Sequence, residues 1–200
     1  MMAHDLPMLR DSVDWIMAND PDHPQTIEWA SFAAMASGAY EVERLLPVLE
    51  RAVEKFPDRY RSASNLSDCY TMLGRPIDAA RTNTVALERL VDHIRRSPED
   101  GHARSLLGVV MVREGKVEDG LAQNRRAEAS TPDDARVWYN HVCALSLAQK
   151  TDEALAKFAA RALELRSSRF DWPTHGDPDL ANLRKHPGFQ ALLESMRASG

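Results

Sequence analysis

The chain has 200 residues, of which 25 are basic and 30 acidic, and its formal net charge at pH 7 is −5. A folded chain of this length buries about 70% of the surface that its unfolded form exposes, so it can build a core without disulfides or a structural metal. The acidic balance argues against nucleic acid as a ligand, because a phosphate backbone needs a concentrated positive face.

The amino-terminal residues predict neither export nor membrane insertion. Met1 to Pro7 contain no basic start followed by an apolar run, so we expect no secretory signal. No later stretch of about 18 apolar residues predicts a membrane span. The two cysteines, Cys69 and Cys143, lie far apart within helical patterns. We expect them to be reduced, packed thiols in a cytoplasmic protein.

Residues 6–19 form the first predicted element. Leu9, Val13 and Ile16 recur at helical spacing, and Pro21 follows the end of the pattern. The segment has no partner helix next to it in sequence. We expect it to cap the elements that follow.

A repeat of about 34 residues then extends from position 26 to position 168. Matching residue classes recur when Thr26, Tyr60, Gly101 and Ala135 are taken as the first positions of four units. Small residues recur near positions eight, twenty and twenty-seven of a unit, tryptophan stands at position four of two units, and proline closes two units. Antiparallel helices pack closely where one side contributes a small residue facing a large one, so each unit predicts a helical hairpin. The residues that carry the pattern include Trp29, Trp138, Gly108, Ala79, Gly120, Ala154, Ala52, Ala86, Ala127, Pro57 and Pro132.

This pattern resembles the tetratricopeptide repeat. The resemblance implies an all-α fold, namely a right-handed superhelical stack of hairpins (an α-solenoid) in a single domain over 1–200. Glycine at Gly74 and Gly115 marks the turn inside two hairpins, where a positive φ is needed. An ordinary helical bundle whose repeats arose by chance is the alternative. The predicted divisions are a capping helix at 6–19, repeats at 26–59, 60–100, 101–134 and 135–168, and a helical cap at 177–197.

Two units depart from the regular pattern. The second unit is longer, and an apolar stripe through Leu87, Leu90 and Ile94 predicts that its second helix extends over 77–96. The extension serves either as packing for the next unit or as a docking element. Pro47 lies within the second helix of the first unit, where it should remove a hydrogen bond and bend the helix.

The tail after the fourth unit predicts two short helices, each with proline near its start. Apolar residues run from Leu180 to Leu193 in this tail. The stretch from Ala135 to Met196 looks like the end of the tetratricopeptide regions of bacterial adenylate cyclases and serine/threonine kinases. That resemblance implies a bacterial regulatory or assembly role. No cyclase or kinase domain accompanies it, so those activities do not carry over.

The spacings of familiar catalytic and cofactor sites are absent from the sequence. The glycines form neither a phosphate-binding loop nor a dinucleotide fingerprint, and no GxSxG nucleophile elbow occurs. The seven histidines include no pair one helical turn apart and no accompanying CxxC, which argues against zinc. His141, two residues from Cys143, predicts a packed imidazole. We expect no catalytic residue, cofactor or metal; an enzyme built on the stack is the alternative.

In tetratricopeptide stacks the first helix of each unit lines a concave groove. Carried to this sequence, the resemblance implies a wall that is small and apolar at the first unit and carries arginines further along. A peptide with an apolar stretch followed by acidic residues would fit it, because arginine binds carboxylates with two hydrogen bonds. The implied groove residues are Arg61, Ser64, Asp68, His102, Ser105, Arg113, Arg136, Tyr139 and Cys143.

The family's clamp for a terminal carboxylate is not reproduced, since Asn65 matches it but Ala30, His102 and Leu106 do not. We therefore expect a non-catalytic adaptor or regulatory scaffold that binds a protein segment, and neither nucleic acid nor membrane. A self-associating assembly scaffold is the alternative. Structural pairing of the groove arginines with acidic residues near them in sequence also stays open.

Overall fold

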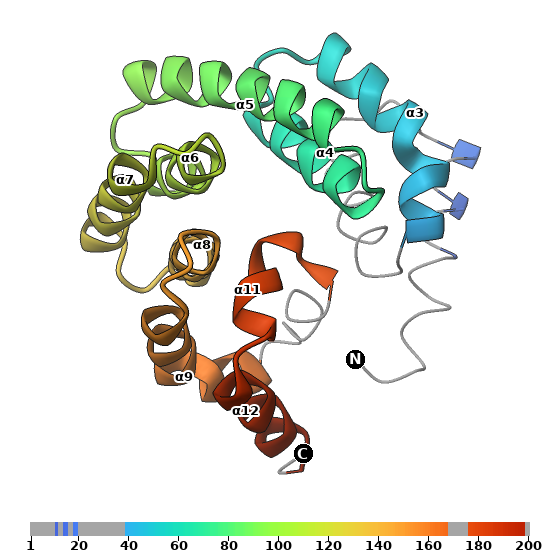
Figure 1. Ribbon diagram of the computed structural model, residues 1–200. Coiled ribbons are helices and arrows are strands. Elements are labelled where there is room, and N and C mark those ends of the chain that lie inside the picture. Colours follow the sequence, from blue (N-terminus) through green and yellow to red (C-terminus); the bar gives the residue numbers. More distant parts are fainter. Residues whose placement is uncertain (1–10, 12–13, 16–17, 20–38, 168–175, 199–200) are drawn as a thin grey trace. The chain divides into compact units, whose positions relative to one another are not determined.

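The computed structural model describes residues 11, 14–15, 18–19, 39–167 and 176–198. All regular secondary structure in this part of the chain is helical, which confirms the all-α prediction there. The predicted capping helix and the first helix of the first repeat lie mainly outside the described residues. The helices are α3 (Ala39–Lys55), α4 (Tyr60–Met72), α5 (Pro76–Arg96), α6 (Gly101–Arg113), α7 (Val117–Ser130), α8 (Ala135–Leu147), α9 (Thr151–Ser167), the 3-10 turn η1 (Pro178–Leu180), α11 (Ala181–Arg184) and α12 (Pro187–Ala198) (Figure 1).

The contacts within the chain define two compact units. The first unit contains the residues up to Arg89 together with 175–178, and the second contains Leu90–Thr174 and the residues from Asp179 onward. The boundary falls inside α5. The single domain predicted over 1–200 stays a prediction.

Three helical hairpins use the same turn between their two helices. The second residue after the end of each first helix is left-handed, with φ of 66° at Gly74, 78° at Gly115 and 60° at Gln149. The next amide closes a backbone hydrogen bond to a residue five positions earlier, as from Arg75 N to Tyr70 O at 2.9 Å. This helix ending favours glycine, so the predicted glycine turns are confirmed. Gln149 adopts the same left-handed conformation although it is not a glycine.

Small residues bring the two helices of a hairpin close together. In the first unit, the Ser67 hydroxyl donates a hydrogen bond to the Ala79 carbonyl at 3.0 Å. In the second unit, a Cβ added at Gly108 would lie 2.7 Å from the Gly120 carbonyl oxygen, so the two backbones nearly touch. Position eight therefore packs against position twenty in both hairpins. Each glycine also faces a larger side chain, as expected: a Cβ at Gly108 would meet Asn124, and one at Gly120 would meet Val112.

The long helix α5 runs to Arg96, as the apolar stripe predicts. Its last turn is tied to the next helix by a contact of 2.8 Å between His93 Nε2 and Asp100 Oδ2. Asp100 also caps α6 by accepting from the Ala103 backbone N–H at 2.9 Å. Pro47 lies inside α3, which continues through it with the proline on its exposed side.

Aromatic residues from three helices form the centre of the second unit. Phe158 of α9 lies 5.7 Å from the Trp138 ring and 5.1 Å from the Phe189 ring, measured between centroids. Phe189 of α12 is fully buried, which contributes about 1.5–3 kcal/mol. The opposite side of α12 carries exposed polar residues such as Gln190 and Glu194. Helix α12 thus covers the apolar side of α9 and turns a polar side outward.

No helix in the described part of the chain is long and apolar enough to cross a membrane.

Candidate functional site

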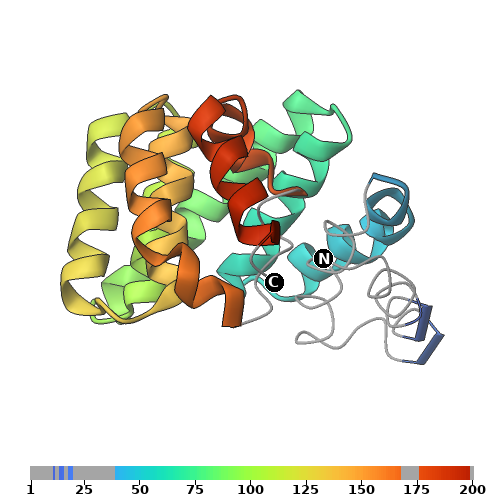
Figure 2. The same ribbon diagram turned by 90° about the horizontal axis from the view of Figure 1, so that it is seen from below.

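The helices of the second unit lie in two rows. Helix α8 packs against both α6 and α11, while α7 and α9 lie on the other side (Figure 1). Figure 2 shows α7, α8 and α9 side by side with nearly aligned axes. We call the side formed by α6, α8 and α11 the first-helix face. The predicted groove residues on α6 and α8 are His102, Ser105, Arg113, Arg136, Tyr139 and Cys143.

Arg113, the last residue of α6, is bound to a carboxylate of the same chain. Its Nε donates to Asp179 Oδ1 at 3.0 Å and its Nη2 donates to Asp179 Oδ2 at 2.6 Å. The two side chains are only 13% and 9% exposed. Two parallel bonds of this kind are the strongest form of arginine–carboxylate contact. Breaking one partner of a buried pair costs about 3–5 kcal/mol, because the other charge stays buried.

The residues that follow Asp179 cover α8. We call residues 179–184 the tail segment. Its Leu180 and Leu183 are fully buried in the cluster that contains Tyr139 and Cys143 of α8. The Leu183 backbone N–H donates to Ser146 Oγ at 3.2 Å. Tyr139 and Cys143, predicted to line the groove, are therefore buried in the same cluster as the chain's own tail.

His102 and Ser105 link α6 to α8. His102 Nε2 contacts Asp134 Oδ2, and Ser105 Oγ accepts from Asn140 Nδ2 at 2.9 Å. Asp134 also caps α8 by accepting from the Arg136 backbone N–H at 2.8 Å. Burial by itself would raise the pKa of Asp134, but the bonds from His102 and from two backbone N–H groups hold it below its ordinary value. These residues join successive hairpins.

Arg136 is the solvent-facing arginine of this set, with a side chain that is 57% exposed. Its Nε lies 3.9 Å from Asp134 Oδ1, at the limit of an ion pair. An exposed pair of this length contributes little to stability. Its guanidinium can therefore meet an external carboxylate at small cost to the fold.

The predicted groove residues of the first unit lie on α4 and form a set of their own. The Arg61 guanidinium lies 5.9 Å from the centre of the Tyr60 ring. Ser64 is buried, and its hydroxyl has no hydrogen-bond partner among the described residues. Asp68 is half-buried.

The sequence pattern did not predict a cluster of charged side chains that joins successive hairpins. His141 Nδ1 lies 2.8 Å from Glu128 Oε2, and Lys157 Nζ lies 2.6 Å from Glu128 Oε1. Burial is the main reason that the pKa of His141 is lowered. Burial alone would raise the pKa of Glu128, but the bonds from Lys157 and His141 hold it below its ordinary value. Three helices contribute one residue each, so no short sequence spacing could predict the cluster.

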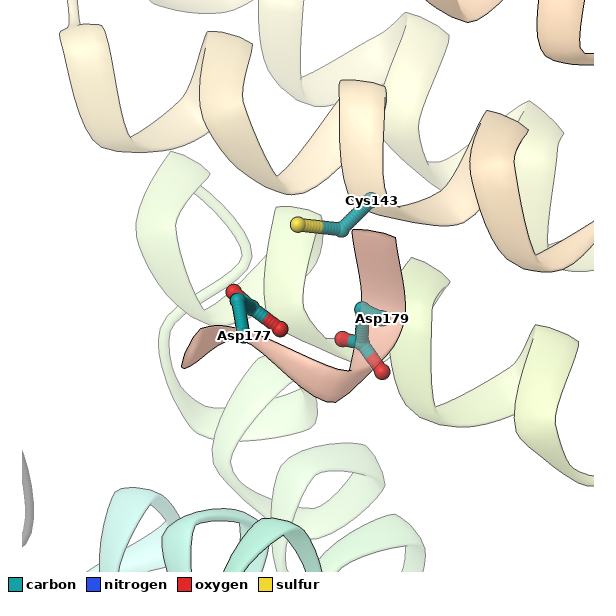
Figure 3. Close-up of side chains that lie close together, drawn as sticks. All are labelled: Cys143, Asp177 and Asp179. Atoms are coloured by element: carbon teal, nitrogen blue, oxygen red, sulfur yellow. The ribbon is translucent and has the colours of Figure 1, made fainter. Parts of the chain in front are cut away.

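Cys143 and Asp179 lie close together on the first-helix face (Figure 3). Asp177, drawn with them, belongs to the segment that groups with the first unit. The Asp179 carboxylate is already bound by Arg113. Two donors, one of them ion-paired, do not build a metal site.

No protein-family model matches the chain, and a search of curated proteins found no match.

Proposed function

We propose that this chain is a non-catalytic protein–protein interaction module of the tetratricopeptide type, an adaptor or regulatory scaffold that binds an acidic protein segment on its first-helix face. The observation that carries the proposal is the pair of Arg113 with Asp179, in which α6 holds a carboxylate through two hydrogen bonds. Arg136 supplies a second positive charge from α8.

The repeated construction of the hairpins supports the same proposal. Equivalent turns and equivalent close contacts between helices extend a stack by addition of like units. Such a stack presents successive first helices side by side, and a chain segment can lie across them. We propose that this stack is superhelical, and the basis for this proposal is the repeat pattern of the sequence.

We place the protein in the cytoplasm, in a bacterial signalling or assembly role. Cys69 and Cys143 are both buried thiols, in agreement with a reducing compartment. The signalling role rests on the resemblance of the carboxyl-terminal third.

A capture experiment with two matched variants tests the binding face. Arg136→Ala removes an exposed charge from the first-helix face, and Arg126→Ala removes an exposed charge from α7 on the other row. Neither change should alter the melting temperature by much, because exposed arginines contribute little to stability. We expect Arg136→Ala to weaken capture of a partner from native lysate and Arg126→Ala to leave it unchanged. Capture by the wild type should weaken as salt rises.

The opposite pattern would overturn the proposal. If Arg126→Ala loses the partner and Arg136→Ala keeps it, the binding surface lies on the side formed by α7 and α9.

Self-association is the second candidate function. Trp15 and Ile77 of the first unit are large apolar residues that are 62% and 83% exposed. Light scattering across a concentration series, with Ile77→Ser as the comparison, tests it. A mass that stays monomeric at all concentrations rejects this candidate.

A further inference from the structure

The tail segment occupies the surface on which the partner is proposed to bind. Asp179 forms an ion pair with Arg113, and Leu180 and Leu183 pack in the cluster that contains residues of α8. The Asn182 side chain adds a hydrogen bond from Nδ2 to the Ser146 carbonyl at 3.0 Å. All of these contacts lie within the second unit.

The chemistry of this occupant matches that expected of the ligand. The sequence pattern predicts a peptide with apolar and acidic residues, bound by arginine. The tail segment is such a peptide, with the acid first and leucines one and four positions later. Its order is the reverse of the predicted one, since the acid that binds Arg113 precedes the leucines.

We propose, on the basis of the proposed function, that the tail segment is an intramolecular stand-in for the partner. The partner contributes an aspartate that binds Arg113, with leucines one and four positions after it that replace Leu180 and Leu183. It binds by displacing the tail segment from α8. The tail segment thereby sets the affinity for every partner of this kind.

Competition of this kind has a defined consequence for affinity. A ligand that binds only the open form shows an apparent Kd that is its intrinsic Kd divided by the open fraction. The bond between Arg113 and Asp179 lowers that fraction. Loss of the Asp179 charge should therefore make the chain bind a separate peptide more tightly.

The experiment uses the full-length chain and a fluorescent synthetic peptide of residues 177–198 as the probe. Asp179→Asn in the full chain keeps the size of the side chain and removes its charge. We expect the variant to bind the probe at least about tenfold more tightly than the wild type, because its open fraction is larger. A probe that carries Asn at its own position 179 is the matched control and should bind weakly. Adding Arg113→Gln to the variant chain should abolish the gain.

The two buried cysteines report opening inside the same sample. Cys143 lies beneath the tail segment, whereas Cys69 lies in the core of the first unit. Thiol labelling mapped by mass spectrometry should become at least about tenfold faster at Cys143 in Asp179→Asn, with Cys69 unchanged. The probe peptide should restore the protection of Cys143. Equal acceleration at both cysteines would show general unfolding and would overturn the proposal.

Two further results overturn it. One is equal affinity of the wild type and Asp179→Asn for the probe. The other is equal binding of the two probe peptides. If the probe behaves as expected but Arg136→Ala captures the same partner as the wild type, the proposed function fails and the competition stands. If capture depends on Arg136 and the probe fails to bind, only the stand-in is refuted.

Discussion

Replacing Gly108 by alanine tests the close crossing of α6 and α7. The added Cβ would lie 2.0 Å from Asn124 Nδ2 and 2.7 Å from the Gly120 carbonyl oxygen. Helix propensity by itself favours alanine over glycine by about 1 kcal/mol. Forcing a methyl group into a packed contact costs about 1–3 kcal/mol. One obstacle is backbone and the other is a fully buried side chain, so the upper end of that range applies.

The expected net effect of Gly108→Ala is a loss of about 2 kcal/mol in the free energy of unfolding. For a chain of this size that loss lowers the melting temperature by about 4–8 °C, which calorimetry can measure. Ala156→Gly, at an exposed position inside α9, measures the propensity effect without the contact. Adding Asn124→Ala should recover only part of the loss, because the Gly120 carbonyl remains in the way. A Gly108→Ala protein as stable as the wild type would falsify the close-crossing argument.

Three further changes test the rest of the second unit. Trp138→Ala should cost about 3–5 kcal/mol, because it opens a cavity beside Phe158. If circular dichroism shows that the variant melts at the same temperature as the wild type, Trp138 is not a core residue. Asp134→Ala should cost about 1 kcal/mol through loss of the α8 cap, whereas Asp134→Asn should retain most of the cap; equal melting temperatures for the two variants would contradict the capping role. The lowered pKa of His141 means that the unfolded chain binds more protons near pH 6, so stability should fall as the pH drops below about 6.5. The lowered pKa of Glu128 adds a further loss below about 4.5. His141→Gln should flatten the change in melting temperature between pH 7.5 and pH 5.5; parallel curves for the two proteins would refute this assignment.

The sequence by itself determined the described helical hairpins and several of their limits. Helices α4, α6 and α8 begin at Tyr60, Gly101 and Ala135, the residues that the repeat pattern sets as first positions. The turn at Gly115 and the length of α5 also follow from local signals. These features depend on propensity and short-range hydrogen bonds, which are encoded within a few residues.

The candidate site was predictable only in its chemistry. The pattern on α6 and α8 indicated that Arg113 binds a carboxylate, but not that the carboxylate belongs to the chain itself. Asp179 stands 66 positions away in sequence, and the resemblance placed it in a cap. The sequence offers acidic residues close to the arginines along the chain as intramolecular partners, and Asp179 is not one of them.

Only the tertiary structure decided which side chains meet across helices. It set Gly108 against Gly120, joined Glu128 to His141, and paired Arg113 with Asp179. Such pairs depend on how far one helix is rotated and shifted along its neighbour. That choice is made by the packing of all the side chains between the helices, and no single segment of sequence contains it.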